Sequence, residues 1–208
     1  MQSWKIMVAI FIASLAISIY FYPFVPEKMA SHWNAEGKVN GYMPKNVALF
    51  LIPFIILFLS LLFIAIPKVD PMKSNIKSFK KYYDGFVILF LIFMLSLHIQ
   101  IILWNTGLKI PFNLFIPLWV AILFFYIGIL LENAQQNWFI GIRTPWTLSS
   151  EKVWNKTHRL GGKLFKIAAF IALAGIFFPK YAIWFILLPA LAFAFCLIAY
   201  SYFEYQKS

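Results

Sequence analysis

The stretch VALFLIPFIILFLSLLFIAI, residues 47–66, carries no charged side chain. It is long enough to cross a lipid bilayer as one α-helix, which needs about 20 apolar residues. Four other runs reach or approach this length: residues 6–24, 86–104, 114–131 and 181–203. With 62% hydrophobic and 12% charged residues, the chain of 208 residues has more apolar surface than a soluble domain can bury. These features predict an all-α integral membrane protein.

A sixth span, residues 164–178, is shorter and carries Lys166 near its start. It can cross the bilayer if this lysine extends to the headgroups, and Pro179 and Lys180 would then form a tight hairpin to the last span. The first span follows Lys5 like a signal peptide, but residues 20–28, YFYPFVPEK, contain no small-residue cleavage site. We therefore expect six transmembrane helices, the first an uncleaved anchor.

The basic residues are divided unequally between the two sides of such a protein. Thirteen of the eighteen Lys and Arg fall on the side of the N-terminus and five on the other side. Because short cytoplasmic links carry the excess of positive charge, both termini are predicted to be cytoplasmic. The net charge of +11 therefore indicates how the protein is oriented in the membrane. Because the basic residues lie in links, no direct contact with nucleic acid is expected.

The chain lacks the residue patterns of most membrane catalysts and carriers. All seven acids fall in links or at helix ends, whereas ion-coupled carriers and intramembrane hydrolases usually need carboxylates or metal ligands within the bilayer. The single cysteine, Cys196, lies in an apolar run and allows neither an intrachain disulfide nor a cysteine-based metal cluster. We expect no enzymatic activity, no cofactor and no metal site.

The first link, residues 26–45, is predicted to be an extracytoplasmic, turn-rich ordered loop, since it holds two glycines between flanking prolines. His32, Trp33 and Asn34 in this loop could bind a ligand. For Trp33 and Tyr42 the alternative is anchoring at the lipid headgroups. A metal at His32 would lack partners, because the other histidines fall in a span and on the opposite side.

The second link, residues 67–84, begins with a helix-start signal. Asp70 suits an N-cap and Pro71 suits the first helical position. Ile76, Phe79 and Tyr83 would then share one face, with lysines around the rest. We expect an amphipathic helix that lies on the anionic inner leaflet and so contacts membrane lipid.

The third span contains Ser96, His98 and Gln100, the most polar stretch in any span. Hydrogen bonds between helices, worth about 1 kcal/mol, are the expected role. The alternative is a proton or ligand contact, which a small transporter or exporter would need.

The fourth link, residues 132–163, holds the longest polar and aromatic patch, NWFIGIRTPWT at residues 137–147. The guanidinium of Arg143, in the extended geometry that precedes Thr144-Pro145, could hold a phosphate or a carboxylate. A short helix is expected to start at Ser149 or Ser150 and to end at Gly161 and Gly162. Trp154 and His158 would share one face of it. A further alternative is a membrane enzyme, in which Arg143 and His158 would act together on a lipid headgroup.

Three stretches resemble the SdpI-type membrane immunity proteins of bacteria. Residues 26–45 match P-x5-H-W-N-x2-G-x3-G-Y-x2-K, and residues 70–79 match D-P-x3-N-x3-F, both typical of a small membrane domain of unknown function that accompanies this family. Residues 137–147 match N-x3-G-I-R-T-P-x-T, and Trp154, His158 and Arg159 follow at the expected spacing. The resemblance implies two domains, residues 1–84 and 85–208.

The resemblance also implies a multi-pass protein of the bacterial cell membrane that protects its producer against a secreted peptide toxin. Such a protein would signal toxin presence by holding a cytoplasmic transcriptional repressor at the membrane. The signature of the fourth link would then be the repressor face, and the outer loop would be the toxin face. The candidate toxin contacts are His32, Trp33, Asn34, Gly37, Gly41, Tyr42 and Lys45. The signature residues are Asn137, Gly141, Arg143, Thr144, Pro145, Thr147, Trp154, His158 and Arg159.

Overall fold

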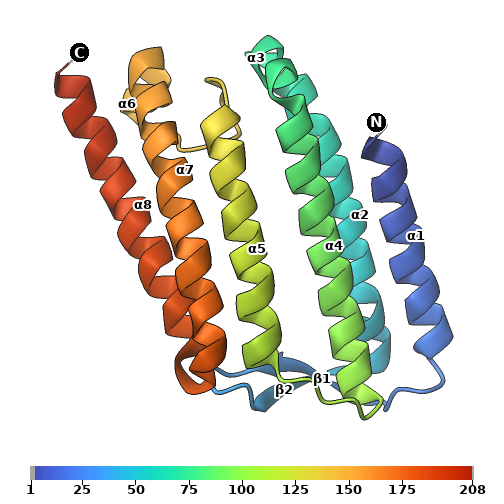
Figure 1. Ribbon diagram of the computed structural model, residues 1–208. Helices are drawn as coiled ribbons and strands as arrows, with labels where there is room; N and C mark the ends of the chain where they lie inside the picture. Colours follow the sequence, from blue (N-terminus) through green and yellow to red (C-terminus); the bar gives the residue numbers. More distant parts are fainter. Residues whose placement is uncertain (1–2, 208) are drawn as a thin grey trace.

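The computed structural model describes residues 3–207 as a bundle of long, roughly parallel and antiparallel helices (Figure 1). Within these residues, six helices are long and apolar enough to cross a membrane. They are α1 (Ser3–Phe21), α2 (Lys45–Val69), α4 (Lys80–Asn105), α5 (Phe112–Asn133), α7 (Glu151–Ala174) and α8 (Ala182–Gln206). The expected all-α membrane fold with six spans is confirmed.

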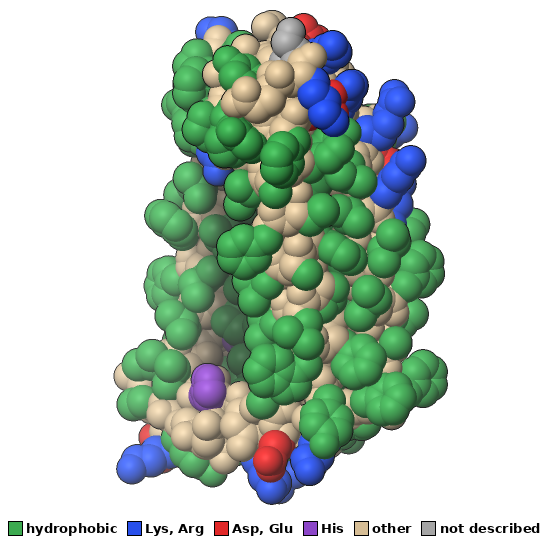
Figure 2. Space-filling model, turned by 90° about the vertical axis from the view of Figure 1, so that its left-hand side faces the viewer, with side chains coloured by type: hydrophobic (Ala, Val, Ile, Leu, Met, Phe, Trp, Pro, Cys, Tyr) green, Lys and Arg blue, Asp and Glu red, His purple; other side chains and the backbone are tan. Residues whose placement is uncertain are grey.

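Short elements connect the long helices. At the end that holds both termini lie α3 (Lys73–Ser78) and α6 (Pro145–Ser149). At the other end, β1 (Lys28–Trp33) and β2 (Val39–Pro44) form an antiparallel hairpin across the bundle (Figure 1). Two 3-10 turns, Gly175–Phe177 and Pro179–Tyr181, join α7 to α8. Figure 2 shows apolar side chains along the length of the bundle and basic side chains gathered towards its two ends.

The first link, expected to be a turn-rich ordered loop, forms a two-stranded hairpin. Lys28 pairs with Pro44 and Ala30 with Tyr42, and the register is irregular between Ala30 and Trp33. Neither strand is rich in β-branched residues or shows a clear alternation of apolar and polar residues, so the sequence gives little strand signal.

The fifth span is also longer than expected, because α7 begins at Glu151 and continues through Gly161 and Gly162. The prediction that these glycines end a short helix was therefore wrong. A Cβ atom on Gly162 would lie 2.9 Å from the carbonyl oxygen of Gly128 in α5. Gly128 and Gly162 thus allow the backbones of α5 and α7 to approach closely, which is a common use of small residues between membrane helices.

The apolar face of the basic second link packs on protein, contrary to the predicted amphipathic helix with this face in lipid. Asp70 follows the last residue of α2, and Ile76, Phe79 and Tyr83 are buried in the protein core. The apolar face that suggested contact with lipid packs instead on α2 and its neighbours, because the short α3 folds back against the end of α2.

Two prolines inside α2 determine how the first helices are hydrogen-bonded. Pro53 and Pro67 have no N–H to donate to the carbonyls of Leu49 and Phe63, four residues earlier. In hydrocarbon an unpaired carbonyl costs several kcal/mol, so each needs another donor. The Ser18 hydroxyl donates to Leu49 O at 2.7 Å, and the Tyr83 hydroxyl donates to Phe63 O at 2.8 Å.

His98 completes the first of these arrangements. Its Nε2 lies 2.9 Å from Ser18 Oγ. The carbonyls of Leu49 and, at 3.0 Å, Ser14 are the acceptors of the one hydroxyl proton of Ser18, so Nε2 carries the proton that it donates to Ser18. The resulting series His98, Ser18, Leu49 links α4, α1 and α2. Gln100 donates to Ile110 O at 2.7 Å, and Ser96 donates to a carbonyl of its own helix, so neither connects two helices.

Helix α4 lies between two helical halves. It packs against α1 and α2 on one side and against α5 on the other, and α5 packs in turn with α7 and α8. The division at residues 84 and 85 remains a prediction, and α4, at the start of the second predicted domain, contacts both halves.

Replacing Ser18 by Ala removes the donor to Leu49 O and the partner of His98. We expect a loss of about 1–2 kcal/mol in the free energy of unfolding, measured in detergent by thermal or denaturant unfolding. The matched control is Pro53→Ala, which gives residue 53 an N–H that can bond Leu49 O. Ser18→Ala should therefore be less destabilising in the Pro53→Ala background. Equal losses in both backgrounds would contradict this account.

Candidate functional site

The link between α5 and α7 is folded around one amide side chain. Asn137 is fully buried, and its Oδ1 accepts hydrogen bonds from the backbone N–H groups of Phe139 and Ile140 at 3.0 and 2.6 Å. Its Nδ2 donates to the carbonyls of Gln135 and Ile140. Because a carboxylate only accepts and a hydroxyl has one proton, asparagine suits this turn particularly well.

Trp154 and His158 of α7 form the floor of the link. Their rings stack with centroids 3.8 Å apart, and both side chains are buried. Trp154 Nε1 donates to Ala134 O at 2.8 Å, at the end of α5. Ile142 N donates to His158 Nε2 at 3.0 Å, so Nε2 has no proton, and Nδ1 donates to Trp154 O at 2.9 Å. His158 is therefore held as the neutral Nδ1–H tautomer.

Gly141 lies directly over this histidine. Its φ is +114°, a conformation that L side chains rarely adopt. A Cβ atom there would also collide with His158 Nε2 and lie 3.4 Å from Trp154. Position 141 thus needs glycine both for its backbone conformation and for the space above the imidazole.

The residues Thr144 to Thr147 start α6 with a reciprocal cap. Thr147 N donates to Thr144 Oγ1 at 3.2 Å, and Thr144 N donates to Thr147 Oγ1 at 2.9 Å. Pro145 occupies the first turn, where its missing N–H has no effect. Thr144 Oγ1 also lies 3.0 Å from Ser201 Oγ, so the cap is joined to α8.

The second link, from the other half of the chain, contacts the signature directly. Asp70 Oδ2 accepts from Trp138 N at 2.9 Å, and Asn75 Nδ2 donates to Gln136 O at 2.8 Å. Asp70 and Asn75 are the polar residues of the D-P-x3-N-x3-F pattern, so two patterns about 60 residues apart meet in one place. The sequence shows each pattern but not that they pair, and Asn75 and Gln136 were not among the predicted site residues.

Apart from Gly141 and Pro145, which shape the backbone of the link, the predicted signature residues fall into two groups. Asn137, Thr144, Thr147, Trp154 and His158 are buried and form the framework of the link. Arg143 and Arg159 are exposed. Arg143 Nη1 donates to Trp138 O at 2.8 Å, which leaves most of its five N–H donors for other contacts. Arg159 lines a shallow polar groove with Lys152 and Lys156.

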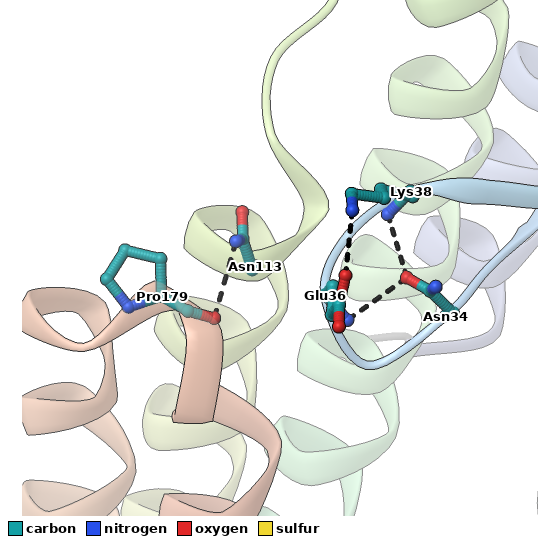
Figure 3. A network of polar contacts seen from close by, with 5 residues as sticks. All are labelled: Asn34, Glu36, Lys38, Asn113 and Pro179. Atoms are coloured by element: carbon teal, nitrogen blue, oxygen red, sulfur yellow. Dashed lines mark hydrogen bonds and ion pairs between the residues drawn. The ribbon is translucent and has the colours of Figure 1, made fainter.

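The hairpin at the opposite end has its own organising asparagine. Asn34 Oδ1 accepts from the backbone N–H groups of Glu36 and Lys38 at 3.0 and 2.9 Å (Figure 3). Gly37 has a φ of +78° at the turn. Lys38 pairs with Glu36 at 2.9 Å, and this contact lowers the pKa of the Glu36 carboxyl.

The tip of the hairpin lies beside the start of α5 and the turn before α8. A Cβ atom on Gly37 would lie 3.2 Å from the side chain of Asn113, which donates to Pro179 O at 3.3 Å (Figure 3). Trp33 stacks on Phe112 of α5 with ring centroids 3.8 Å apart. The ring of Trp33 thus packs on protein, so its expected alternative role as a headgroup anchor is not needed to explain it.

The base of the hairpin is held by α4 and α2. Asn105 accepts from Ala30 N at 2.7 Å and donates to Ala30 O at 3.0 Å, as a neighbouring strand would. Lys45 pairs with Glu27 at 2.6 Å. Gly41 has no room for a side chain, because a Cβ atom would lie 2.9 Å from that of His32.

Two of the candidate contacts in the hairpin remain exposed. His32 and Tyr42 are exposed, and His32 Nδ1 lies 2.5 Å from Asn40 Oδ1. The hairpin therefore presents a polar and aromatic face on a rigid support.

These arrangements give little support to the two alternatives, a transporter and a membrane enzyme. His98 and Gln100, which a transport path would use, are buried and bonded to protein groups. Both ring nitrogens of His158 are bonded to the backbone, so the Arg143 and His158 pair has no free base. Among residues 3–207, no group of three or more His, Cys, Asp or Glu could hold a metal ion.

Comparison with known proteins identifies relatives of both halves. Residues 133–202 match the SdpI/YfhL protein family, and residues 9–57 match a domain of unknown function, DUF1648. The immunity protein SdpI of Bacillus subtilis (strain 168) is 30% identical over 196 residues, which cover 93% of this chain and 91% of that protein. No solved structure matches the chain.

Gly141→Ala is expected to destabilise the link, because the new methyl group meets His158 in a backbone conformation that disfavours any side chain. Gly107→Ala is the matched control, since Gly107 has a φ of +110° and open space where its Cβ would be. Both variants should lose about 1 kcal/mol through the backbone, and Gly141→Ala should lose at least about 1 kcal/mol more through overpacking. Unfolding in detergent measures both, and equal losses would show that the contact with His158 is unimportant.

Proposed function

This chain belongs to the SdpI/YfhL protein family, and from that premise we propose that it protects its cell against a secreted, membrane-active peptide toxin. It is a multi-pass protein of the cell membrane. The observation that carries the proposal is the similarity to an immunity protein over 93% of the chain, a length that takes in both the hairpin and the signature link.

We also propose that the end with both termini faces the cytoplasm. The support is the charge distribution, since the topology predicted from the sequence assigns thirteen of the eighteen Lys and Arg to that side. The hairpin then faces outward, where a secreted toxin arrives, and the signature link faces inward, where a transcriptional repressor is found.

The outer face of the hairpin is the proposed toxin contact. His32 and Tyr42 are exposed on two strands that pair with each other, His32 opposite Gly41 and Tyr42 opposite Ala30. Aromatic and imidazole side chains on a rigid support can bind a peptide with little loss of conformational entropy. Since the hairpin rests on Asn105 of α4 and on Phe112 of α5, a bound toxin would act on the junction of the two halves.

Arg143 and Arg159 are the proposed contacts for the repressor. Both are exposed, and the buried framework below Arg143 fixes the backbone that carries it. A guanidinium with free N–H donors recognises carboxylates in a two-pronged geometry. The proposed surface of the repressor that binds here is therefore acidic. The protein would signal the presence of toxin by holding the repressor at the membrane while toxin is bound.

The proposed orientation can be tested by cysteine labelling. In a Cys196→Ala background, Lys38→Cys at the hairpin should react with a membrane-impermeant maleimide in intact cells. Lys152→Cys on α7 should react only after the membrane is permeabilised. Both lysines are exposed, so reactivity reports the side of the membrane. Labelling of Lys152→Cys in intact cells would contradict a cytoplasmic signature.

The function is tested in toxin-sensitive cells that express the chain and are challenged with an Sdp-type toxin peptide. Survival and a potential-sensitive dye report protection, and the position of a fluorescent repressor reports the relay. We expect protection by the natural chain and loss of both readouts in the double variant His32→Ala, Tyr42→Ala.

Arg143→Gln should retain protection and release the repressor to the cytoplasm, whereas the control Lys73→Gln, at the same end, should change neither readout. If the natural chain is present in the membrane and the potential still collapses, the immunity function is excluded for this toxin. If Arg143→Gln keeps the repressor at the membrane, the assignment of the partner face is wrong.

A further inference from the structure

A cavity of about 710 Å³ lies among the first helices, at the end of the bundle that holds the termini. Its apolar walls come from α1, α2, α3 and α4, and they include Trp4, Met7, Phe63, Ile64, Ile76 and Tyr83. A volume of this size is typical of sites that bind a small molecule.

The cavity follows from the unequal lengths of these helices. α1 has 19 residues, whereas α2 has 25 and α4 has 26. At 1.5 Å per residue, α1 is shorter than α2 by roughly 9 Å. Figure 1 shows α1 starting well below the level of α3, so α2 and α4 extend past its first turn. The space beside their ends is left without a covering helix.

Three lysines line the same cavity: Lys68, Lys77 and Lys80. Lys80 pairs with Asp84, the one acid of the lining, at 2.5 Å, so their charges offset each other. Lys68 belongs to α2 and Lys77 to α3. Among residues 3–207, neither lysine has a carboxylate within ion-pair distance. The cavity thus combines apolar walls with two uncompensated ammonium groups.

We propose that this cavity binds an anionic phospholipid, with an acyl chain on the apolar walls and the phosphate held by Lys68 and Lys77. The ends of membrane helices lie at the depth of the lipid headgroups, where a phosphate and an acyl chain are both at hand. A free phosphate would leave the apolar walls uncovered, and a zwitterionic lipid would bring its own cation towards the two ammonium groups. The anionic lipid matches both the charge and the polarity of the site.

The cavity also borders the framework of the signature link. Tyr83 and Phe63 line it, and the same two residues line a second cavity of about 300 Å³ whose other walls include Ile140 and Ile142. The Tyr83 hydroxyl donates to Phe63 O between them. A lipid in the first cavity therefore supports the wall that separates it from the signature, and its binding stabilises the folded protein.

The test uses the full-length protein, delipidated in mild detergent and titrated with dioleoylphosphatidylglycerol or dioleoylphosphatidylcholine. Native mass spectrometry measures the bound lipid, and thermal unfolding measures the stabilisation. We expect the phosphatidylglycerol complex to dominate. The double variant Lys68→Gln, Lys77→Gln should bind it roughly tenfold more weakly, as expected for the loss of two partly screened charges.

The matched control is Lys73→Gln, Lys81→Gln, which makes the same change of charge in the same segment but outside the cavity lining. It should retain the affinity of the natural chain. Ile64→Trp should also weaken binding by filling the apolar part, whereas Leu187→Trp, on the exposed face of α8, should not.

Three results would overturn the proposal: equal binding of the two lipids, equal affinity of the two lysine double variants, or full displacement of the lipid by millimolar inorganic phosphate. The last would identify a phosphate site without a lipid tail. A dimer that excludes lipid from the natural chain would assign the cavity to a second copy of this protein and would equally refute a lipid site.

Discussion

A carbonyl inside a membrane has no water to accept from, and this constraint explains the arrangement of the first three spans. Pro53 and Pro67 leave two carbonyls of α2 without their helical donors. Ser18 and Tyr83 supply the missing donors from α1 and α4, and His98 fixes the direction of the Ser18 hydroxyl. In these spans Ser18 and Tyr83 thus bond to backbone carbonyls, and His98 bonds to Ser18.

Much of the fold could be predicted from the sequence because the bilayer imposes a length and a polarity on each helix. The apolar runs locate all six spans, and the uninterrupted apolar stretch of residues 47–66 is enough to identify an integral membrane protein. The errors lie where neighbouring elements decide the outcome. Gly161 and Gly162 look like a helix end but allow α7 to approach α5, and Ile76, Phe79 and Tyr83 look like a lipid-facing stripe but face α2 and its neighbours.

The candidate site shows the same division. The resemblance to a family identifies the signature residues, but only the structure separates framework from surface. His158 and Asn137 resemble ligand-binding residues in the sequence, yet their polar atoms are bonded to backbone groups of the link. The pairing of Asp70 with Trp138 joins segments 68 residues apart, and a single sequence carries no signal for such a contact. Arg143 and Arg159 are the predicted signature arginines that stay exposed, and Arg143 keeps most of its N–H donors free.

The two helical halves are fastened to each other at both ends of the bundle. At the hairpin end, Trp33 and Asn105 attach one strand pair to α5 and α4, and at the other end Asp70 and Asn75 hold the signature link. A hinge motion between the halves would need one end of the bundle to open, which would break the contacts at that end. The motion left to the molecule is a shear, in which one half slides or twists along α4 and α5 while both ends stay closed. A change at the hairpin would then reach the opposite end as a small rotation of whole helices.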